Sequence, residues 1–187
     1  MTGDEAVGVL LGILRGLDID HMLVGSLSTN VYGIPRATKD ADMVLLLKSG
    51  DLQRIEEQLP NGFVIDAQAT FEMVTSTRRY SLNIKEIPFE IELFMLSEDV
   101  FDQSRFHRRR AIQFLDKPTF VPSAEDVILQ KLLWFHRSKR AKDRIDARDV
   151  LYVQKGTLDW DYLNAWSLRQ GTSEILSRLR VEIQGLE

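Results

Sequence analysis

The chain has 187 residues, of which 44% are hydrophobic and 28% charged, and its 24 Lys and Arg against 28 Asp and Glu give a formal net charge of −4. This length and composition predict one globular domain, or one domain with a small helical appendage, and exclude collagen-like, low-complexity and intrinsically disordered chains. The sequence contains no cysteine, which excludes disulfides, thiolate metal sites and cysteine nucleophiles.

The charge is distributed unevenly along the sequence. Residues 105–155 contain 13 Lys and Arg against 6 Asp and Glu, a net +7, which leaves 11 against 22, or −11, for the rest of the chain. A basic segment attracts polyanions, so the mean charge does not exclude a nucleic-acid partner. The N-terminus lacks the pattern of a secretory signal, and no apolar run approaches the ~20 residues that span a bilayer. We therefore expect a cytoplasmic protein that does not associate with membranes.

The first third of the chain predicts alternating helices and strands. Apolar residues at helical spacing indicate a helix over residues 4–17, with Asp4 at its N-terminal end, where the helix dipole favours negative charge. The apolar run that ends at Gly25 indicates a strand, and residues 26–32 indicate a short helix that Gly33 and Pro35 terminate. A buried strand over 41–47 and a helix over 50–59 follow.

The middle of the chain changes to antiparallel strands, and the last part to helices. We expect strands over 63–66, 71–75, 79–84, 89–96, 111–115 and 119–121. From Ser123, which begins a capping signal, helices follow to about residue 135 and then around 145–153, 160–168 and 173–183. The fold class is α+β, with a mixed sheet of five or more strands flanked by helices. The division falls near residue 122, between a core over 1–122 and a helical subdomain over 123–187 that packs on it.

Two aspartates at the start of the 41–47 strand carry the first chemical signal. Asp40 and Asp42 are two residues apart, so strand geometry places both carboxylates on one face. They would repel each other unless a cation lies between them, and Mg²⁺ binds a few carboxylates together with substrate phosphates. The same pattern also occurs in solvated turns before strands, so it needs support from neighbouring motifs.

That support comes from Gly25 and Ser26, at the end of the preceding strand. A residue without a side chain lets backbone N–H groups approach a phosphate at the start of a helix, where the dipole favours anions. The order of strand, Gly-Ser, helix and Asp-x-Asp strand resembles the nucleotidyltransferase superfamily related to DNA polymerase β. The form Arg36-x-Thr38-x-Asp40-x-Asp42 resembles its branch of AbiE-type (AbiEii/AbiGii toxin-like) nucleotidyltransferases. The resemblance implies the nucleotidyltransferase fold and a role for Gly25, Ser26, Arg36 and Thr38 in nucleotide binding.

The resemblance also implies a third carboxylate on a later, neighbouring strand. Glu90 and Glu92 share one face of the 89–96 strand, and Ile91-Glu-Leu-Phe94 matches the family pattern best, which favours Glu92 over Glu90. Asp40, Asp42 and Glu92 would then hold Mg²⁺ or Mn²⁺, with Glu92 as general base on the acceptor hydroxyl. An alternating surface strand is the structural alternative for the two glutamates.

A second stretch of resemblance lies in the helical part. A helix with Lys131 before an apolar pair, followed by Arg140-Ala-Lys-Asp-Arg-Ile-Asp146, resembles the toxin-like branch, in which these elements close the nucleotide site. Because Lys131 lies within an apolar face, it needs an anion. We expect Lys131 to reach a triphosphate oxygen and Asp143 or Asp146 to orient it or the nucleotide. The alternative is a Lys131 whose stem packs while its ammonium reaches solvent, with Asp143 as a cap.

These motifs predict a metal-dependent enzyme that moves NMP from an NTP to an acceptor hydroxyl and releases pyrophosphate. The basic region 105–155 favours RNA, such as a tRNA end, as acceptor, and the toxin branch implies a possible antitoxin partner. One alternative is an aminoglycoside-type small-molecule acceptor, for which the acidic part of the chain would form the pocket. Another is a binding module that keeps the fold without turnover, in which Glu stands where the family commonly has Asp. We expect Trp134, Trp160 and Trp166 in the core rather than stacked on bases.

Overall fold

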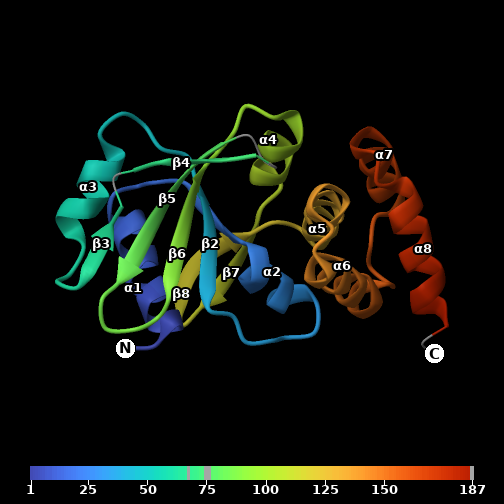
Figure 1. The fold of residues 1–187 in the computed structure, drawn as a ribbon, viewed down its shortest axis with the longest axis horizontal. Helices are drawn as coiled ribbons and strands as arrows, with labels where there is room; N and C mark the ends of the chain where they lie inside the picture. The colour runs from blue at the N-terminus through green and yellow to red at the C-terminus, as the bar shows by residue number, and fades with distance from the viewer. Residues whose placement is uncertain (67, 74–76, 186–187) are drawn as a thin grey trace. The chain divides into compact units, whose positions relative to one another are not determined.

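The computed structural model describes residues 1–66, 68–73 and 77–185 (Figure 1). The chain forms two compact units, one of residues 1–27 and 37–121 and the other of residues 28–36 and 122–187. Helix α2 (Gly25–Tyr32) begins in the first unit, and its last five residues belong to the second. The sequence does not indicate that the segment 28–36 groups with the C-terminal helices.

A six-stranded mixed sheet forms the centre of the first unit. Its order is β1-β2-β6-β5-β3. The short strand β4 also pairs with β5, along residues 77–79, whereas β3 pairs along residues 82–84. Only β2 and β6 are parallel among these pairs of described strands. The strand bounds are β1 His21–Val24, β2 Asp40–Leu45, β3 Phe63–Ile65, β4 Thr70–Glu72, β5 Thr77–Ile84 and β6 Glu90–Met95. The parallel pair β2–β6 is thus flanked by strands on both sides.

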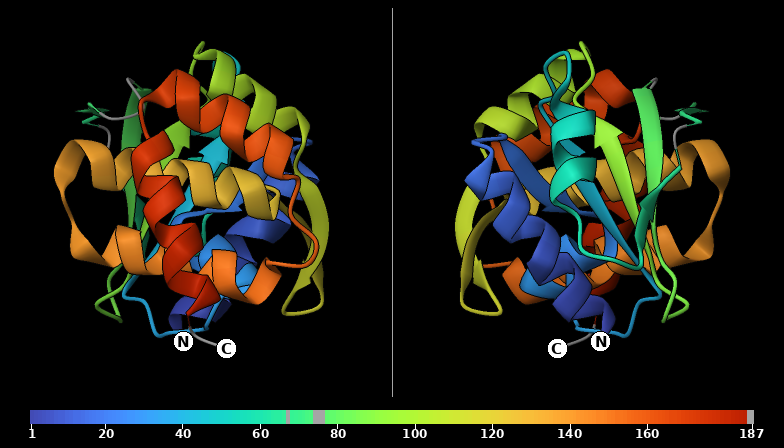
Figure 2. Two further views of the ribbon diagram at one scale, coloured as in Figure 1. Left: turned by 90° about the vertical axis from the view of Figure 1, so that its right-hand side faces the viewer. Right: turned by 90° about the vertical axis from the view of Figure 1, so that its left-hand side faces the viewer.

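Helices and a hairpin surround this sheet. Helix α1 (Gly3–Gly16) begins with a capping box, in which the Thr2 hydroxyl accepts from the Glu5 N–H and the Glu5 carboxylate accepts from the Thr2 N–H. Its apolar face is buried, and α1 contacts β2, α3 (Asp51–Gln58) and the second strand of the hairpin β7 (Arg110–Phe114) and β8 (Lys117–Val121). Figure 2 shows α1 beside α3. The buried leucines of α1 and the apolar residues of β1, β2 and β6 form the core of this unit.

The second unit is helical. It contains α5 (Ala124–Ser138), α6 (Ala141–Gln154), α7 (Trp160–Gln170) and α8 (Ser173–Gln184). Helix α5 packs on α6 and α7, and α8 packs on α6 and α7. Ser123 caps α5 by accepting from the Asp126 N–H, as the sequence predicts. Helix α6 begins four residues before the predicted 145, so that Asp143 and Asp146 both lie on it.

The predicted α+β class with a mixed sheet and C-terminal helices is confirmed. Helix α4 (Val100–His107) was not predicted from the sequence, and Asp99 caps it by accepting from the N–H groups of Phe101 and Asp102. The predicted strand over 71–75 extends outside the described residues, because 74 and 75 are not among them. Within the described part of the chain, no helix is long and apolar enough to cross a membrane.

Candidate active site

The two aspartates of the Asp-x-Asp motif lie at the start of β2, in the first unit. Asp40 and Asp42 are half-buried, whereas the intervening Ala41 and the following Met43 are buried. The alternation puts the two carboxylates on one face of the sheet, as their spacing predicts. The Thr38 hydroxyl donates to Asp40 Oδ1 at 2.5 Å. Thr38, a predicted nucleotide-binding residue, therefore contacts the first aspartate.

The two glutamates of β6 lie directly beside these aspartates. In the parallel register Asp40 pairs with Glu90 and Asp42 with Glu92. Burial raises the pKa of Glu92 to about 7, and a hydrogen bond with Asp42 and the negative charges of Asp42 and Glu90 act in the same direction. The Glu92 and Asp42 carboxyl groups are therefore in direct contact. This contact favours Glu92 over Glu90 as the third carboxylate.

Arg79 on β5 is a partner of Glu92 that was not identified from the sequence. Its Nη1 donates to Glu92 Oε1 at 2.6 Å and its Nε to the Thr70 hydroxyl at 3.1 Å. Arg79 lowers the pKa of Glu92, but burial and Asp42 outweigh it. The alternation of the 79–84 strand indicates which face Arg79 occupies. The sequence predicts these two consecutive strands as antiparallel, but it does not give their register, so the contact of Arg79 with Glu92 could not be predicted.

Gly25 brings the backbone against Asp42. It follows β1, whose last residue Val24 pairs with Asp42, and it has φ +59°. A Cβ on Gly25 would lie 1.8 Å from Asp42 Oδ2, so no larger residue fits this close approach. Gly25 and the buried Ser26 are the first residues of α2, where backbone N–H groups are left without helical acceptors. Asp42 therefore lies directly beside the first residue of α2, as the sequence predicts.

The remaining predicted site residues come together in the second unit. Lys131 is 6% exposed, and its Nζ lies 3.1 Å from Asp143 Oδ1 and 2.8 Å from Asp146 Oδ2. Arg36 donates to both oxygens of Asp146 at 3.1 and 3.0 Å, and Arg140 donates to Asp143 at 2.8 Å. Burial acts to raise the pKa of Asp146, but the Arg36 hydrogen bond and the charge of Lys131 outweigh it and lower that pKa. Lys131 thus pairs with both aspartates. The roles expected from the sequence, with Lys131 on a triphosphate oxygen and Asp143 or Asp146 orienting it or the nucleotide, stay predictions.

The site residues thus form one group in each unit. Asp40, Asp42 and Glu92 lie in the first unit with Gly25, Ser26 and Thr38, whereas Arg36, Lys131, Asp143 and Asp146 lie in the second. Among the described residues, no three acidic or histidine side chains are already arranged around a metal position. The donor chemistry nevertheless fits Mg²⁺ or Mn²⁺, because such ions take few protein carboxylates and complete their shell with phosphates and water. The adjacent carboxyl groups of Asp42 and Glu92 offer neighbouring oxygens to such an ion.

Part of the basic region 105–155 is committed to internal contacts. Arg105 is buried and pairs with Asp102 at 2.8 Å, and Arg109 pairs with Asp20 at 2.5 Å. Arg109 also lies over an aromatic ring, with its guanidinium carbon 4.4 Å from the centroid of Phe106. These two arginines of the 105–110 cluster therefore stabilise the first unit.

Exposed cations remain at the turn between α5 and α6. Arg137, Lys139 and Lys142, which we call the basic turn, are exposed. Two aromatic side chains lie beside this turn: the Arg140 guanidinium is 4.7 Å from the Trp134 ring centroid, and the Lys139 ammonium is 6.0 Å from that of Phe135. The basic turn is therefore a cluster of exposed cations within the region 105–155, which also has exposed cations at Arg110, Lys117 and Lys155.

Solved structures of other proteins share this fold. A nucleotidyltransferase-like antigenic protein of Paracoccidioides brasiliensis is 18% identical with a TM-score of 0.56, covering 95% of this chain and 92% of its own. JHP933 of Helicobacter pylori is 18% identical with a TM-score of 0.54, covering 97% and 90%. The antibiotic-resistance factor ANT(2'')-Ia is 10% identical with a TM-score of 0.60, covering 96% and 97%. These similarities show the nucleotidyltransferase fold, and a comparison with curated proteins found no match.

A protein-family model identifies the branch. The model described as nucleotidyl transferase AbiEii toxin, type IV TA system, matches residues 25–175, a range that begins at Gly25 and includes every candidate site residue. Membership implies an NTP substrate and an antitoxin. The chain belongs to the AbiEii family of nucleotidyltransferase toxins of type IV toxin–antitoxin systems.

Proposed function

We propose that the protein transfers a nucleoside monophosphate from an NTP to a hydroxyl of an RNA. The family supplies the nucleotidyl transfer, and the metal dependence, the residue roles and the acceptor are the proposal. The observation that carries it is the contact of Glu92 with Asp42 across the parallel pair of β6 and β2, beside Gly25. It provides a base and a metal-binding carboxylate side by side.

The acceptor oxygen attacks the α-phosphorus of the NTP. A bond forms between them, the bond from the α-phosphorus to the oxygen bridging to the β-phosphorus breaks, and pyrophosphate leaves. Glu92 takes the proton of the hydroxyl as general base. Asp40, Asp42 and Glu92 would hold Mg²⁺ or Mn²⁺, which when bound neutralises the charge that develops on the phosphate oxygens.

The polar groups around these carboxylates have supporting roles. The backbone N–H groups at Gly25 and Ser26 offer donors to phosphate oxygens. Thr38 holds Asp40 through its hydroxyl. In the second unit, Arg36 and Lys131 are the candidate cations for nucleotide binding, and Asp143 and Asp146 position them.

RNA is the acceptor that the exposed charge favours. The basic turn presents three exposed cations, of which Lys139 lies beside the Phe135 ring, and the neighbouring Arg140 lies beside the Trp134 ring. Binding of a polyanion at such a surface comes largely from neutralised phosphates, so its affinity falls steeply with salt.

The test is incorporation of label from each α-³²P-labelled NTP, with Mg²⁺ or Mn²⁺, into total tRNA and into a panel of aminoglycosides. We expect labelled RNA with the unsubstituted protein and a loss of at least about 100-fold with Asp42→Asn. Label in an aminoglycoside alone would replace RNA with a small-molecule acceptor, the chemistry that the fold relative ANT(2'')-Ia carries as a resistance factor. Label in neither acceptor with any NTP would refute turnover and leave a binding module.

A further inference from the structure

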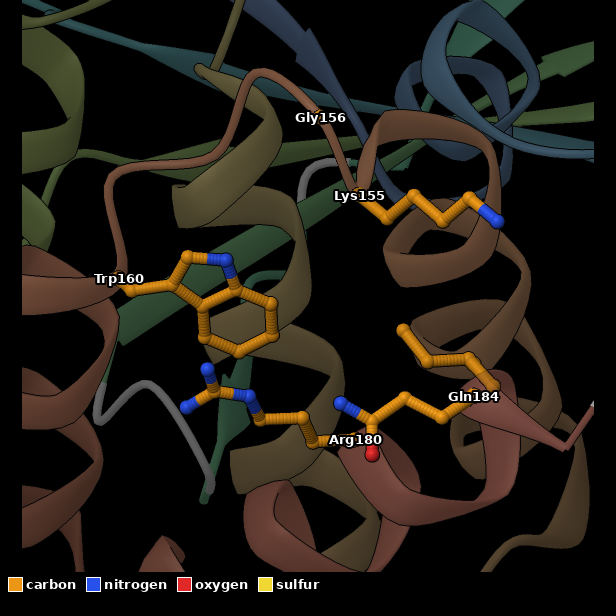
Figure 3. Close-up of a pocket in the computed structure, with 6 residues that line it drawn as sticks. Lys155, Gly156, Trp160, Arg180 and Gln184 are labelled. Atoms are coloured by element: carbon orange, nitrogen blue, oxygen red, sulfur yellow. The ribbon is translucent and has the colours of Figure 1, made fainter.

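The second unit contains a cavity that is lined by none of the candidate active-site residues named above. Its volume is about 270 Å³, and it is lined by Lys155, Gly156, Trp160, Arg180, Ile183 and Gln184 (Figure 3). These residues come from the end of α6, the start of α7 and the last turns of α8. The cavity is close to the lower end of the ~300–1,000 Å³ range of small-molecule pockets, which suits a single small planar ligand.

An arginine stacked on a tryptophan forms one wall. The Arg180 guanidinium carbon lies 4.3 Å from the centroid of the Trp160 ring, and Figure 3 shows the two side chains next to each other. Arg180 is exposed, and no carboxylate pairs with it among residues 1–66, 68–73 and 77–185. Arg178 on the same helix is different, because it pairs with Glu174. Stacking leaves the N–H edges of a guanidinium available to an anion.

The rest of the lining favours the same ligand chemistry. Lys155 also lines the cavity, and its ammonium lies 5.4 Å from the Tyr152 ring centroid. None of the described residues that line the cavity is acidic. Gln184 presents an amide, whose oxygen accepts and whose nitrogen donates, and Figure 3 shows that amide directed toward Arg180 and Trp160. Ile183 is 3% exposed and provides an apolar base. An arginine, an aromatic plane and an amide suit a planar heterocycle that carries a phosphate.

We propose that this cavity binds one nucleotide of single-stranded RNA, with its phosphate on Arg180 and its base against Trp160. The Gln184 amide hydrogen-bonds to the edge of that base. Stacking on an aromatic residue together with a cation on the backbone phosphate is how proteins bind unpaired strands without strong sequence preference. The proposal rests on the proposed function, in which RNA is the acceptor, and adds a second contact for that RNA besides the basic turn.

Fluorescence anisotropy with a fluorescein-labelled, unstructured 12-nucleotide RNA tests the site on the full chain. Arg180→Ala is compared with Arg178→Ala, which removes the same charge from the same helix but outside the cavity. We expect Arg180→Ala to weaken binding about fivefold or more and to make the slope of log K against log salt shallower by about 1. Arg178→Ala is expected to stay within about twofold. Equal losses in the two variants, or no loss in either, would overturn the site.

Two further arms test the chemistry of the ligand. Trp160→Phe keeps a ring, whereas Trp160→Leu removes it, so we expect weaker binding only with leucine. Equal affinity in the two Trp160 variants would overturn base stacking. A 12-base-pair RNA duplex hides its bases, and an equal effect of Arg180→Ala on duplex and single strand would reduce the site to a general phosphate contact. AMP and unlabelled 12-mer RNA are also compared as competitors at equal nucleotide concentration. Equal competition by the two would assign the cavity to free nucleotides instead of RNA. Thermal unfolding of each variant verifies that it is folded.

The binding measurement contains neither NTP nor divalent metal, so it is independent of the transfer reaction. Failure of NMP incorporation with intact Arg180-dependent RNA binding would refute the proposed function and keep the site. Incorporation of NMP into RNA, with no effect of the Arg180 or Trp160 substitutions on RNA binding, would support the proposed function and refute the cavity as an RNA site.

Discussion

Arg79 on β5 donates to Glu92 on β6 at 2.6 Å, on the side chain that also contacts Asp42 on β2. Three adjacent strands thus contribute one cation and two carboxyl groups to a single chain of contacts. An arginine in this position offsets part of the repulsion between two acids and fixes the orientation of one of them. It links the sheet order directly to the geometry of the candidate active site.

The first prediction concerns Arg79 as a positioning residue. We expect Arg79→Ala to lower NMP transfer by about 10-fold or more, because Glu92 loses the donor that orients it. Arg79→Lys keeps the charge but not the fork of donors, so partial activity is expected. Initial rates at saturating NTP measure the effect.

The matched control for Arg79 is its neighbour. Arg78→Ala removes the same side chain from the opposite face of β5, where the residue is exposed, and its rate is expected to equal that of the unsubstituted protein. Equal rates for Arg78→Ala and Arg79→Ala would show that Arg79 does not position Glu92.

The second prediction concerns the close approach at Gly25. Gly25→Ala places a Cβ 1.8 Å from Asp42 Oδ2 at a backbone φ of +59°, so either the carboxylate or the strand end must shift. We expect loss of transfer and a decrease of about 1–3 kcal/mol in the free energy of unfolding. Urea denaturation and initial rates are the two measurements.

Gly16→Ala is the control for this substitution. Gly16 lies in the last turn of α1, and a Cβ there would meet open space, with no neighbouring side chain of the described residues within 4 Å. Alanine at this position is therefore expected to be neutral or stabilising by up to about 1 kcal/mol. Unchanged transfer in Gly25→Ala would mean that Asp42 tolerates displacement and does not take part in the reaction.

The third prediction separates structural from nucleotide-binding roles of Lys131. Lys131→Met leaves Asp143 and Asp146 buried with less compensating charge, so we expect a loss of about 3–5 kcal/mol in the free energy of unfolding. Lys142→Met, at an exposed position of α6, is expected to change it by less than about 0.5 kcal/mol. Urea denaturation at pH 7 measures both. A fully stable Lys131→Met that loses only NTP affinity would contradict a structural role for the ion-paired cluster.

Local sequence patterns were sufficient to predict most helices and strands. They were not sufficient to predict which residues of different strands contact each other. The helix over 4–17 and the strand of Asp40 and Asp42 follow from periodicity, which depends only on neighbouring residues. Helix α4 was missed because its sequence is rich in polar and charged residues, although Asp99 is a recognisable cap. Glu92 was identified through the family resemblance, whereas its contact with Arg79 depends on the register between β5 and β6. The parallel pairing of β6 with the distant strand β2 is set by packing of the whole unit.

The fourth prediction concerns the pH dependence of stability and His21. The Nδ1 of His21 lies 2.9 Å from the Ile19 carbonyl oxygen and donates to it, and its Nε2 is buried without a partner among the described residues. Burial lowers the pKa of His21, Arg109 lowers it further, and the Ile19 carbonyl and Asp20 oppose this. The folded state therefore holds a neutral imidazole, whereas the unfolded chain binds a proton near pH 6.5.

The sign of the effect follows from this difference. A lowered pKa in the folded state contributes stability that is complete above about pH 6.5 and is lost as the pH falls below it, because protons then favour the unfolded chain. We expect the free energy of unfolding to fall between about pH 7.5 and 5.5, and to fall less in His21→Phe, whose ring would occupy the same place beside Phe120. Urea denaturation at several pH values isolates the difference, since the carboxyl groups titrate in both proteins. Parallel pH profiles would show that His21 titrates alike in the folded and unfolded states.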